Sequence, residues 1–199
     1  MRDRVTASFN NFGYPVTIDP WKVASSKVLV KDKWISLRAD KCLTSAGKVI
    51  DPYYVIDYPH WVTIFPITKD AELILVRQYR HGLGKILLEL PCGAYDDGEV
   101  SSTTVAAREL TEETGYTGVH FEEIATFSPN PANHSNLSHV VLATDLEHTQ
   151  PQNLDLGEDI EVVLMPLKIA QQELREGTFV QAMHVAAMYY AFNYLENFD

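Results

Sequence analysis

Short runs of β-branched and aromatic residues, separated by turn residues, fill much of the chain up to residue 90 and recur after residue 120. Runs of this kind are typical of β-strands. Lys69-Asp70 makes a plausible hairpin turn between two of the stronger runs. The pattern predicts strands at Lys27–Lys33, Trp34–Leu43, Lys48–Asp57, Trp61–Thr68, Glu72–Tyr79, Ile86–Leu90, Phe121–Phe127, Leu137–Ala143 and Glu161–Leu167.

Three segments are expected to be helical: Thr103–Thr114, Leu167–Glu176 and Val180–Leu195. Ser101 or Ser102 can cap the start of the first, and Gly115 stands where a glycine commonly ends a helix. The resulting order is strands, helix, strands and then helices, which favours a mixed α/β or α+β sandwich over a regular βαβ array. The first twenty residues are polar and rich in turn residues, so we expect a loop or a loosely tethered arm there.

Composition limits the classes of function. The 199 residues suffice for one well-cored domain, with or without a small appendage. The net charge of -11 argues against a large nucleic-acid-binding face, which needs a basic stripe. Two cysteines cannot build a disulfide framework, and neither a signal-like segment nor a long apolar run is present. A cytoplasmic protein without membrane or nucleic-acid partners is therefore expected.

The predicted helix at 103–114 carries three carboxylates on one side. Glu109, Glu112 and Glu113 share an arc of about 100°, and like charges at this spacing repel each other. Oxygen ligands gathered on one face suit a hard cation such as Mg²⁺ or Mn²⁺. Arg108 lies four residues before Glu112 and can pair with it, which would fix the direction of that carboxylate.

This segment resembles the Nudix box, written GX5EX7REUXEEXGU with U an aliphatic residue. Gly93 and Glu99 match its first half, Arg108 to Glu113 match REUXEE, and Gly115 matches the last glycine. There are two departures. Eight residues instead of seven separate Glu99 from Arg108, which puts the role of Glu99 in doubt, and Tyr116 replaces the final aliphatic residue.

A narrower resemblance is to the ADP-ribose pyrophosphatases of that superfamily. It rests on Val76–Arg80, on Glu89–Gly93 and on Pro131, which follows Tyr116 by fifteen residues. The resemblance implies an α/β/α sandwich with a mixed sheet over residues 61–199. It also implies a small β-rich segment over residues 1–60 that pairs subunits into a homodimer. The implied reaction is Mg²⁺-dependent hydrolysis of ADP-ribose to AMP and ribose 5-phosphate.

The resemblance also assigns roles to residues of the box. Glu109 and Glu113 would bind the metal, Glu112 would support or join them, and Glu99 is a further candidate ligand. The backbone carbonyl of Cys92 would complete the set, its thiol being incidental. Where many relatives carry a Glu in a later loop, this chain has Asn136, which cannot act as a base. Glu158, Asp159 and Glu161 are the next candidates, and Glu158 is preferred.

Phosphate and base contacts are expected outside the box. Arg80 and Arg77 present planar forks that suit phosphate oxygens, but neighbours of this spacing point to opposite sides of a strand. Arg77 could equally be a surface residue. Trp34 is the leading candidate to stack on the base, with Trp21 as an alternative, although tryptophans are more often core or interface residues.

Two other functions stay open at this stage. One is hydrolysis of another nucleotide sugar or of a dinucleotide such as NADH, although the SQPWPFPxS-like run of NADH-preferring relatives is missing. The other is a catalytically weak nucleotide sensor on the same fold. Such sensors usually carry a degraded box and an attached DNA-binding segment, and neither is seen.

Overall fold

The computed structural model describes residues 8–9, 15–16 and 18–197, which form two compact units. The first comprises the described residues up to Tyr58 together with Ala132–Ser135, and the second comprises the remaining described residues. Most of the arm expected over residues 1–20 lies outside the described residues. Within them, strands β1 (Ser8–Phe9) and β2 (Pro15–Val16) pair antiparallel.

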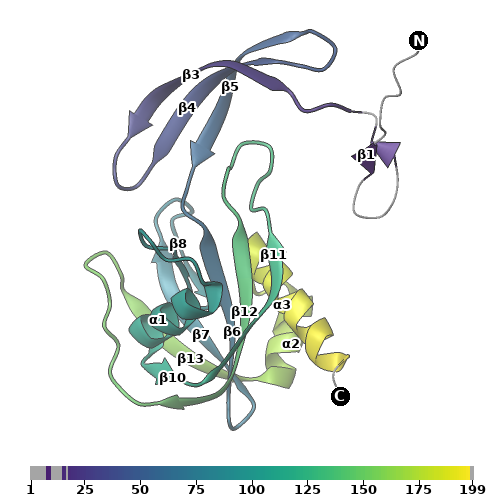
Figure 1. Ribbon diagram of the computed structural model, residues 1–199. Coiled ribbons are helices and arrows are strands. Elements are labelled where there is room, and N and C mark those ends of the chain that lie inside the picture. Colours follow the sequence, from purple (N-terminus) through teal and green to yellow (C-terminus); the bar gives the residue numbers. More distant parts are fainter. Residues whose placement is uncertain (1–7, 10–14, 17, 198–199) are drawn as a thin grey trace. The chain divides into compact units, whose positions relative to one another are not determined.

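The main feature of the first unit is an antiparallel sheet of β3 (Lys22–Lys31), β4 (Ser36–Leu43) and β5 (Val49–Asp57), in that order (Figure 1). The side chain of Asp32 accepts hydrogen bonds from the backbone N–H groups of Trp34 and Ile35 and thereby shapes the first turn. Strand β3 begins five residues before the predicted start, because its polar first half still finds ladder partners on β4.

The second unit is built on a mixed sheet of eight strands in the described part of the chain. Its central order is β10-β12-β6-β7-β13, with β6 and β12 parallel and the other pairs antiparallel; β11, β8 and β9 pair with β12, β7 and β6. The strands are β6 (Trp61–Thr68), β7 (Glu72–Arg80), β8 (Lys85–Glu89), β9 (Cys92–Ala94), β10 (Tyr116–Thr117), β11 (His120–Phe127), β12 (Ser138–His148) and β13 (Ile160–Pro166).

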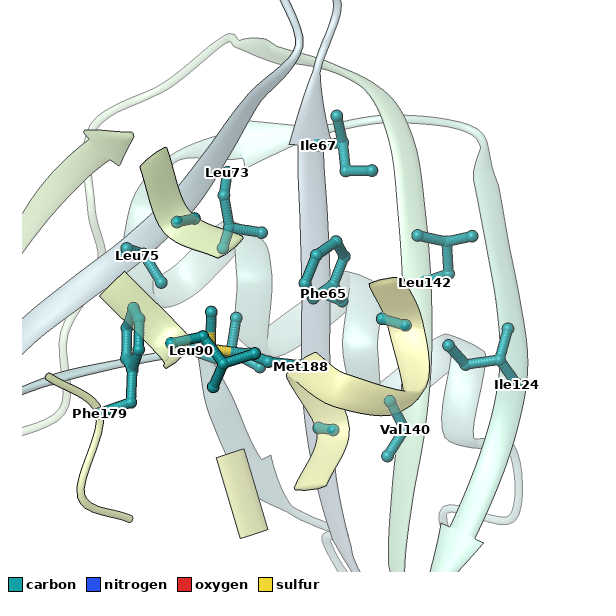
Figure 2. Packing of buried hydrophobic residues seen from close by; sticks show 14 residues of the cluster. Phe65, Ile67, Leu73, Leu75, Leu90, Ile124, Val140, Leu142, Phe179 and Met188 are labelled. Carbon is teal, nitrogen blue, oxygen red and sulfur yellow. The ribbon is translucent and has the colours of Figure 1, made fainter. Parts of the chain in front are cut away.

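Helices cover both faces of this sheet, as Figure 1 shows: α1 (Ser102–Thr114) on one face, α2 (Leu167–Glu176) and α3 (Ala182–Glu196) on the other. Successive residues of a strand point to opposite faces of the sheet, so each central strand contributes side chains to two hydrophobic clusters, one on each face. Ile64 packs with Val105 and Leu110 of α1, whereas Phe65 packs with Met188 of α3. Figure 2 shows the second of these clusters. The α/β/α sandwich with a mixed sheet is thus confirmed.

Apart from β3 and β12, the long elements agree with the predictions to within a few residues. Strand β6 and helix α2 match the predicted bounds, and α1 begins one residue earlier than expected. Strand β12 is longer than predicted, continuing to His148. The short strands β9 and β10 flank the segment of α1 and were not predicted, since two or three residues show no periodicity.

Candidate active site

The candidate site is built on α1 and on β9, which precedes it in the chain. Ser101 caps α1 by accepting a hydrogen bond from the Thr104 N–H, and Gly115 ends it at a φ of 73°. Gly93 lies directly against Glu109, because a Cβ added at residue 93 would stand 1.9 Å from the Glu109 carboxyl carbon. Only a glycine therefore lets the backbone of β9 approach the helix this closely.

Two carboxylates of α1 are withdrawn from water beneath β9. Glu113 is 2% exposed, and its Oε2 accepts a hydrogen bond of 3.1 Å from the backbone N–H of Cys92. Burial raises the pKa of Glu109 to about 7 and that of Glu113 well above its ordinary value, and in each case the charge of the other neighbouring glutamates adds to the effect. Burying two acids together is unfavourable unless positive charge arrives.

Arg108 gathers the carboxylates of the box. Its guanidinium donates to both oxygens of Glu99 at 3.1 and 3.0 Å, to Glu109 at 2.8 Å and to Glu112 at 3.0 Å. It also donates to the carbonyl oxygen of Ala94 at 3.1 Å, which ties the loop to the helix. The predicted pairing of Arg108 with Glu112 is present. Glu99 is turned to Arg108, so this arginine is its immediate partner.

The donor set fits a hard divalent cation. No group of three or more His, Cys, Asp or Glu side chains forms a ready cage within the described residues. Glu109 and Glu113 nevertheless supply carboxylate oxygens that are largely shielded from water, and this burial, followed by the charge of neighbouring glutamates, raises the pKa of both. Glu158 lies near enough for its charge to raise both pKa values. These are the oxygen ligands that Mg²⁺ and Mn²⁺ prefer.

A second polar cluster surrounds Arg80. Its Nε and Nη2 donate to Oε2 of Glu89 at 2.9 and 2.8 Å, and its Nη2 lies 3.7 Å from Sγ of Cys92. Glu89 is fully buried, and its other oxygen, Oε1, has no hydrogen-bond partner among the described residues. Burial raises the pKa of the Cys92 thiol. A neutral, shielded thiol agrees with the interpretation that this side chain is incidental.

Sequence reasoning assigned no role to Glu89, which it used only as part of the Glu89–Gly93 run, and did not single out His184. Glu89 ends the apolar run of β8 and is buried. An acidic residue at the end of an apolar strand was the feature of the sequence that could have pointed to it. His184 lies in α3, and its Nδ1 accepts a hydrogen bond of 3.2 Å from the backbone N–H of Leu90. Burial, and then the charge of Arg80, lower the pKa of His184 to about 3, so the ring is neutral at ordinary pH.

The remaining arginine and the candidate bases lie as follows. Arg77 forms an ion pair of 2.7 Å with Glu161, its register partner on β13, and lies on the opposite side of β7 from Arg80. Glu161 is thereby engaged, whereas Oε2 of Glu158 accepts only a local hydrogen bond from the Asp155 N–H among the described contacts. Asn136 is buried and donates to the carbonyl oxygen of Pro59, a structural role.

The tryptophans and Pro131 are more dispersed. Trp34 is 74% exposed in the turn after β3, with the Lys33 ammonium 4.2 Å from its ring centre. Trp21 packs edge-on against Tyr53 at 5.9 Å, and both lie in the first unit with Trp34. Pro131 is an exposed residue of the second unit, in the segment between β11 and β12. The sequence predicted Trp34 as the first residue of a strand, whereas β4 begins two residues later at Ser36. The roles of Trp34, Trp21 and Pro131 remain predictions.

Comparison with known families agrees with this geometry. The family model described as "NUDIX domain" matches residues 58–183. The chain belongs to the Nudix family. A second model, "Nucleoside diphosphate sugar hydrolase N-terminal domain", matches residues 21–56, over the β3-β4-β5 sheet. This Nudix protein is therefore a pyrophosphatase of the branch that acts on nucleoside diphosphate sugars, and enzymes of the family generally depend on a metal ion.

Individual relatives of this Nudix protein point the same way. An "ADP-ribose pyrophosphatase" of Bacillus subtilis is 32% identical, with 76% of this chain and 87% of the relative covered. An "ADP-sugar pyrophosphatase" of Mus musculus is 36% identical, with 72% of each chain covered. A solved structure titled "Crystal structure of ADP compounds hydrolase" superposes with a TM-score of 0.80 at 25% identity, covering 92% of this chain and 97% of that one.

Among the described residues, no helix is long and apolar enough to span a membrane.

Proposed function

We propose that this Nudix pyrophosphatase hydrolyses ADP-ribose to AMP and ribose 5-phosphate with the help of Mg²⁺, or alternatively Mn²⁺. The observation that carries the proposal is the pair of carboxylates facing the backbone of β9, the buried Glu113 and Glu109, whose side chain is 12% exposed. The preference for ADP-ribose is supported by the names of the relatives from Bacillus subtilis and Mus musculus.

The metal would be held by Glu109 and Glu113, with Glu112 and the backbone carbonyl of Cys92 beside them and Glu99 as a further candidate. When bound, the cation would neutralise the diphosphate oxygens and lower the pKa of a bound water molecule. Arg108 keeps the carboxylates oriented through its hydrogen bonds to Glu109 and Glu112. This arrangement makes Arg108 a residue that prepares the site before substrate arrives.

Glu158 is the proposed general base. Its charge is close enough to raise the pKa of both Glu109 and Glu113. In the proposed reaction its carboxylate would take a proton from the attacking water molecule. Asp159 is the neighbouring alternative. Glu161 is less suitable, because Arg77 already occupies it.

Arg80 is the preferred phosphate ligand, and Arg77 is the second candidate. Glu89 takes Nε and Nη2 of Arg80 but not Nη1, and the side chain is 40% exposed. A partly exposed guanidinium that is fixed at two donors can offer its remaining nitrogen to a phosphate oxygen without losing much freedom. Trp34 is proposed to stack on the adenine and Pro131 to line the substrate site.

We also propose a homodimer formed through the first unit. The sheet β3-β4-β5, together with Trp21 just before it, exposes several large apolar side chains, which a second copy of the chain could cover. They are Trp21, Val23, Val28, Leu29, Val30, Leu43, Val49 and Tyr54. Multi-angle light scattering at micromolar concentration should give twice the mass of 22.5 kDa, and a monomer would contradict the proposal.

A substrate panel tests the proposed activity. The purified protein is incubated with ADP-ribose, ADP-glucose, UDP-glucose, GDP-mannose and NADH at equal concentration, with Mg²⁺ or with EDTA. We expect the highest kcat/KM on ADP-ribose, products AMP and ribose 5-phosphate, and no turnover in EDTA. Preference for another compound would reassign the substrate, whereas binding without turnover of any of them would indicate a sensor.

A further inference from the structure

The link between β8 and β9 is held by two side chains that come from opposite faces of the sheet. Pro91 has no N–H, so Leu90 and Cys92 supply the backbone donors on either side of it. The Leu90 N–H donates to Nδ1 of His184 at 3.2 Å, and the Cys92 N–H donates to Oε2 of Glu113 at 3.1 Å. The Pro91 carbonyl accepts from the Ile64 N–H at 2.9 Å.

His184 stands where an apolar residue would be the ordinary choice. It is 1% exposed, and its helix α3 contributes Met188 to the apolar cluster that also contains Leu90 (Figure 2). A buried imidazole sacrifices hydration, and the hydrogen bond from Leu90 is what compensates for that loss. Because the partner is an N–H group, Nδ1 must be the acceptor, which fixes the ring in one tautomer.

The two bonds lie only two residues apart and restrain the same short piece of backbone. Cys92 lies directly after Pro91 and carries the backbone carbonyl proposed as a metal ligand. Glu113 is a second proposed ligand, and it also accepts the hydrogen bond from the Cys92 N–H. An error in the position of Leu90 is therefore passed to the carbonyl and to the carboxylate together. Groups that orient metal ligands commonly change metal affinity by about 10- to 100-fold when removed.

We propose that His184 is a positioning residue that fixes the Leu90–Cys92 backbone and thereby sets the geometry of the cation site from the far side of the sheet. The inference rests on the proposed function insofar as that function places the cation at Cys92 and Glu113. It assigns no contact between His184 and substrate. Its effect is exerted entirely through the backbone that His184 holds.

Two substitutions separate the hydrogen bond from mere packing. His184→Leu keeps the volume roughly but removes the acceptor. His184→Asn places an oxygen where Nδ1 stands and so retains it. Met188→Ala serves as the control. Met188 lies one turn further along α3 and is fully buried, but the Leu90 N–H donates its hydrogen bond to His184 and not to Met188.

Two quantities are measured on the full chain. The first is its affinity for Mn²⁺, monitored by electron paramagnetic resonance, and the second is the hydrogen-exchange rate of the Leu90 amide. For His184→Leu we expect roughly tenfold weaker Mn²⁺ binding and at least roughly tenfold faster exchange at Leu90. His184→Asn should stay within about threefold of the parent in both, and Met188→Ala within about threefold in Mn²⁺ binding. Should His184→Leu fail to fold, His184→Gln, which moves the acceptor by one bond, takes its place with the same expectation.

Unchanged Mn²⁺ binding in His184→Leu overturns the proposal, even if Leu90 exchanges faster, because the bond would then be structural only. Equal weakening in Met188→Ala overturns it too, since general loosening of α3 would suffice. A parent protein that does not bind Mn²⁺ refutes the metal site of the proposed function and this inference with it. Binding by the parent with no effect in the variants refutes the role of His184 alone.

Discussion

Replacing Glu109 by Gln should stabilise the metal-free protein at alkaline pH while destroying its metal site. Burial raises the pKa of Glu109 from 4.5 to about 7. Each pKa unit corresponds to about 1.4 kcal/mol, so ionising this carboxyl costs the folded state about 3 kcal/mol more than the unfolded state. Glutamine has no such charge and avoids that cost above pH 7.

The sign of the pH dependence follows from proton binding. Between pH 4.5 and about 7 the folded protein holds the Glu109 proton more tightly than the unfolded chain does. This contribution to the free energy of unfolding is therefore present at low pH and is lost as pH rises through the folded pKa. The advantage of Glu109→Gln should be small at pH 5, about a quarter of its full size, and complete at pH 8.

Thermal melting in EDTA at pH 5 and pH 8 measures the effect. For a protein of this size, about 3 kcal/mol corresponds to a Tm increase of roughly 6–12 °C. Glu112→Gln is the matched control, because it removes a charge from the same helix at a more exposed position, and its Tm should change by no more than about 2 °C. Added Mg²⁺ should raise the Tm of the parent at pH 8 but not that of Glu109→Gln. A Glu109→Gln variant that melts at or below the parental Tm at pH 8 would refute the reasoning.

Three further predictions concern the box and the first unit. Gly93→Ala should lower both Tm and turnover, because the new Cβ would stand 1.9 Å from Glu109, whereas Gly82→Ala, with nothing within 4 Å, should be neutral in melting and in kcat. Arg108→Lys should weaken activation by Mg²⁺ by about 10- to 100-fold in a metal titration, since an ammonium cannot hold Glu99, Glu109 and Glu112 together; parental activation would refute that role. Trp34→Ala should leave Tm unchanged, because the ring is 74% exposed, and should raise KM more than it lowers kcat; an unchanged KM removes Trp34 from the site.

The parts of the fold that could be predicted are those with a strong local signal. Strand β6 is buried on both faces and therefore appears as an almost continuous apolar run, and α1 is marked by its capping serine and its terminal glycine. Strand β9 could not be found in this way. Its three residues are held by pairing with β6, which precedes it by about thirty residues, and by the close approach of Gly93 to Glu109.

The candidate site divides along the same line. Glu109, Glu112 and Glu113 share a helical face, so their spacing alone placed them together. The hydrogen bonds from Arg108 to Glu99 could not be predicted, because the extra residue between them left the path of the loop, and so the position of Glu99, undetermined by the sequence. Glu89 and His184 lie 95 residues apart in chain order and meet only around Arg80 and Leu90, a relation that depends on tertiary packing.

The most direct test of the central assignment is Glu113→Gln, measured by thermal melting and by ADP-ribose hydrolysis across a Mg²⁺ titration. The Glu113 carboxylate is buried and accepts a hydrogen bond from the Cys92 N–H, and the side-chain oxygen of a glutamine can still accept that bond. The account predicts a Tm at or above the parental value and a loss of turnover of at least about 100-fold, because the charge that holds the metal is gone. A variant that melts normally and hydrolyses ADP-ribose at nearly the parental rate would contradict the placement of the metal site on α1.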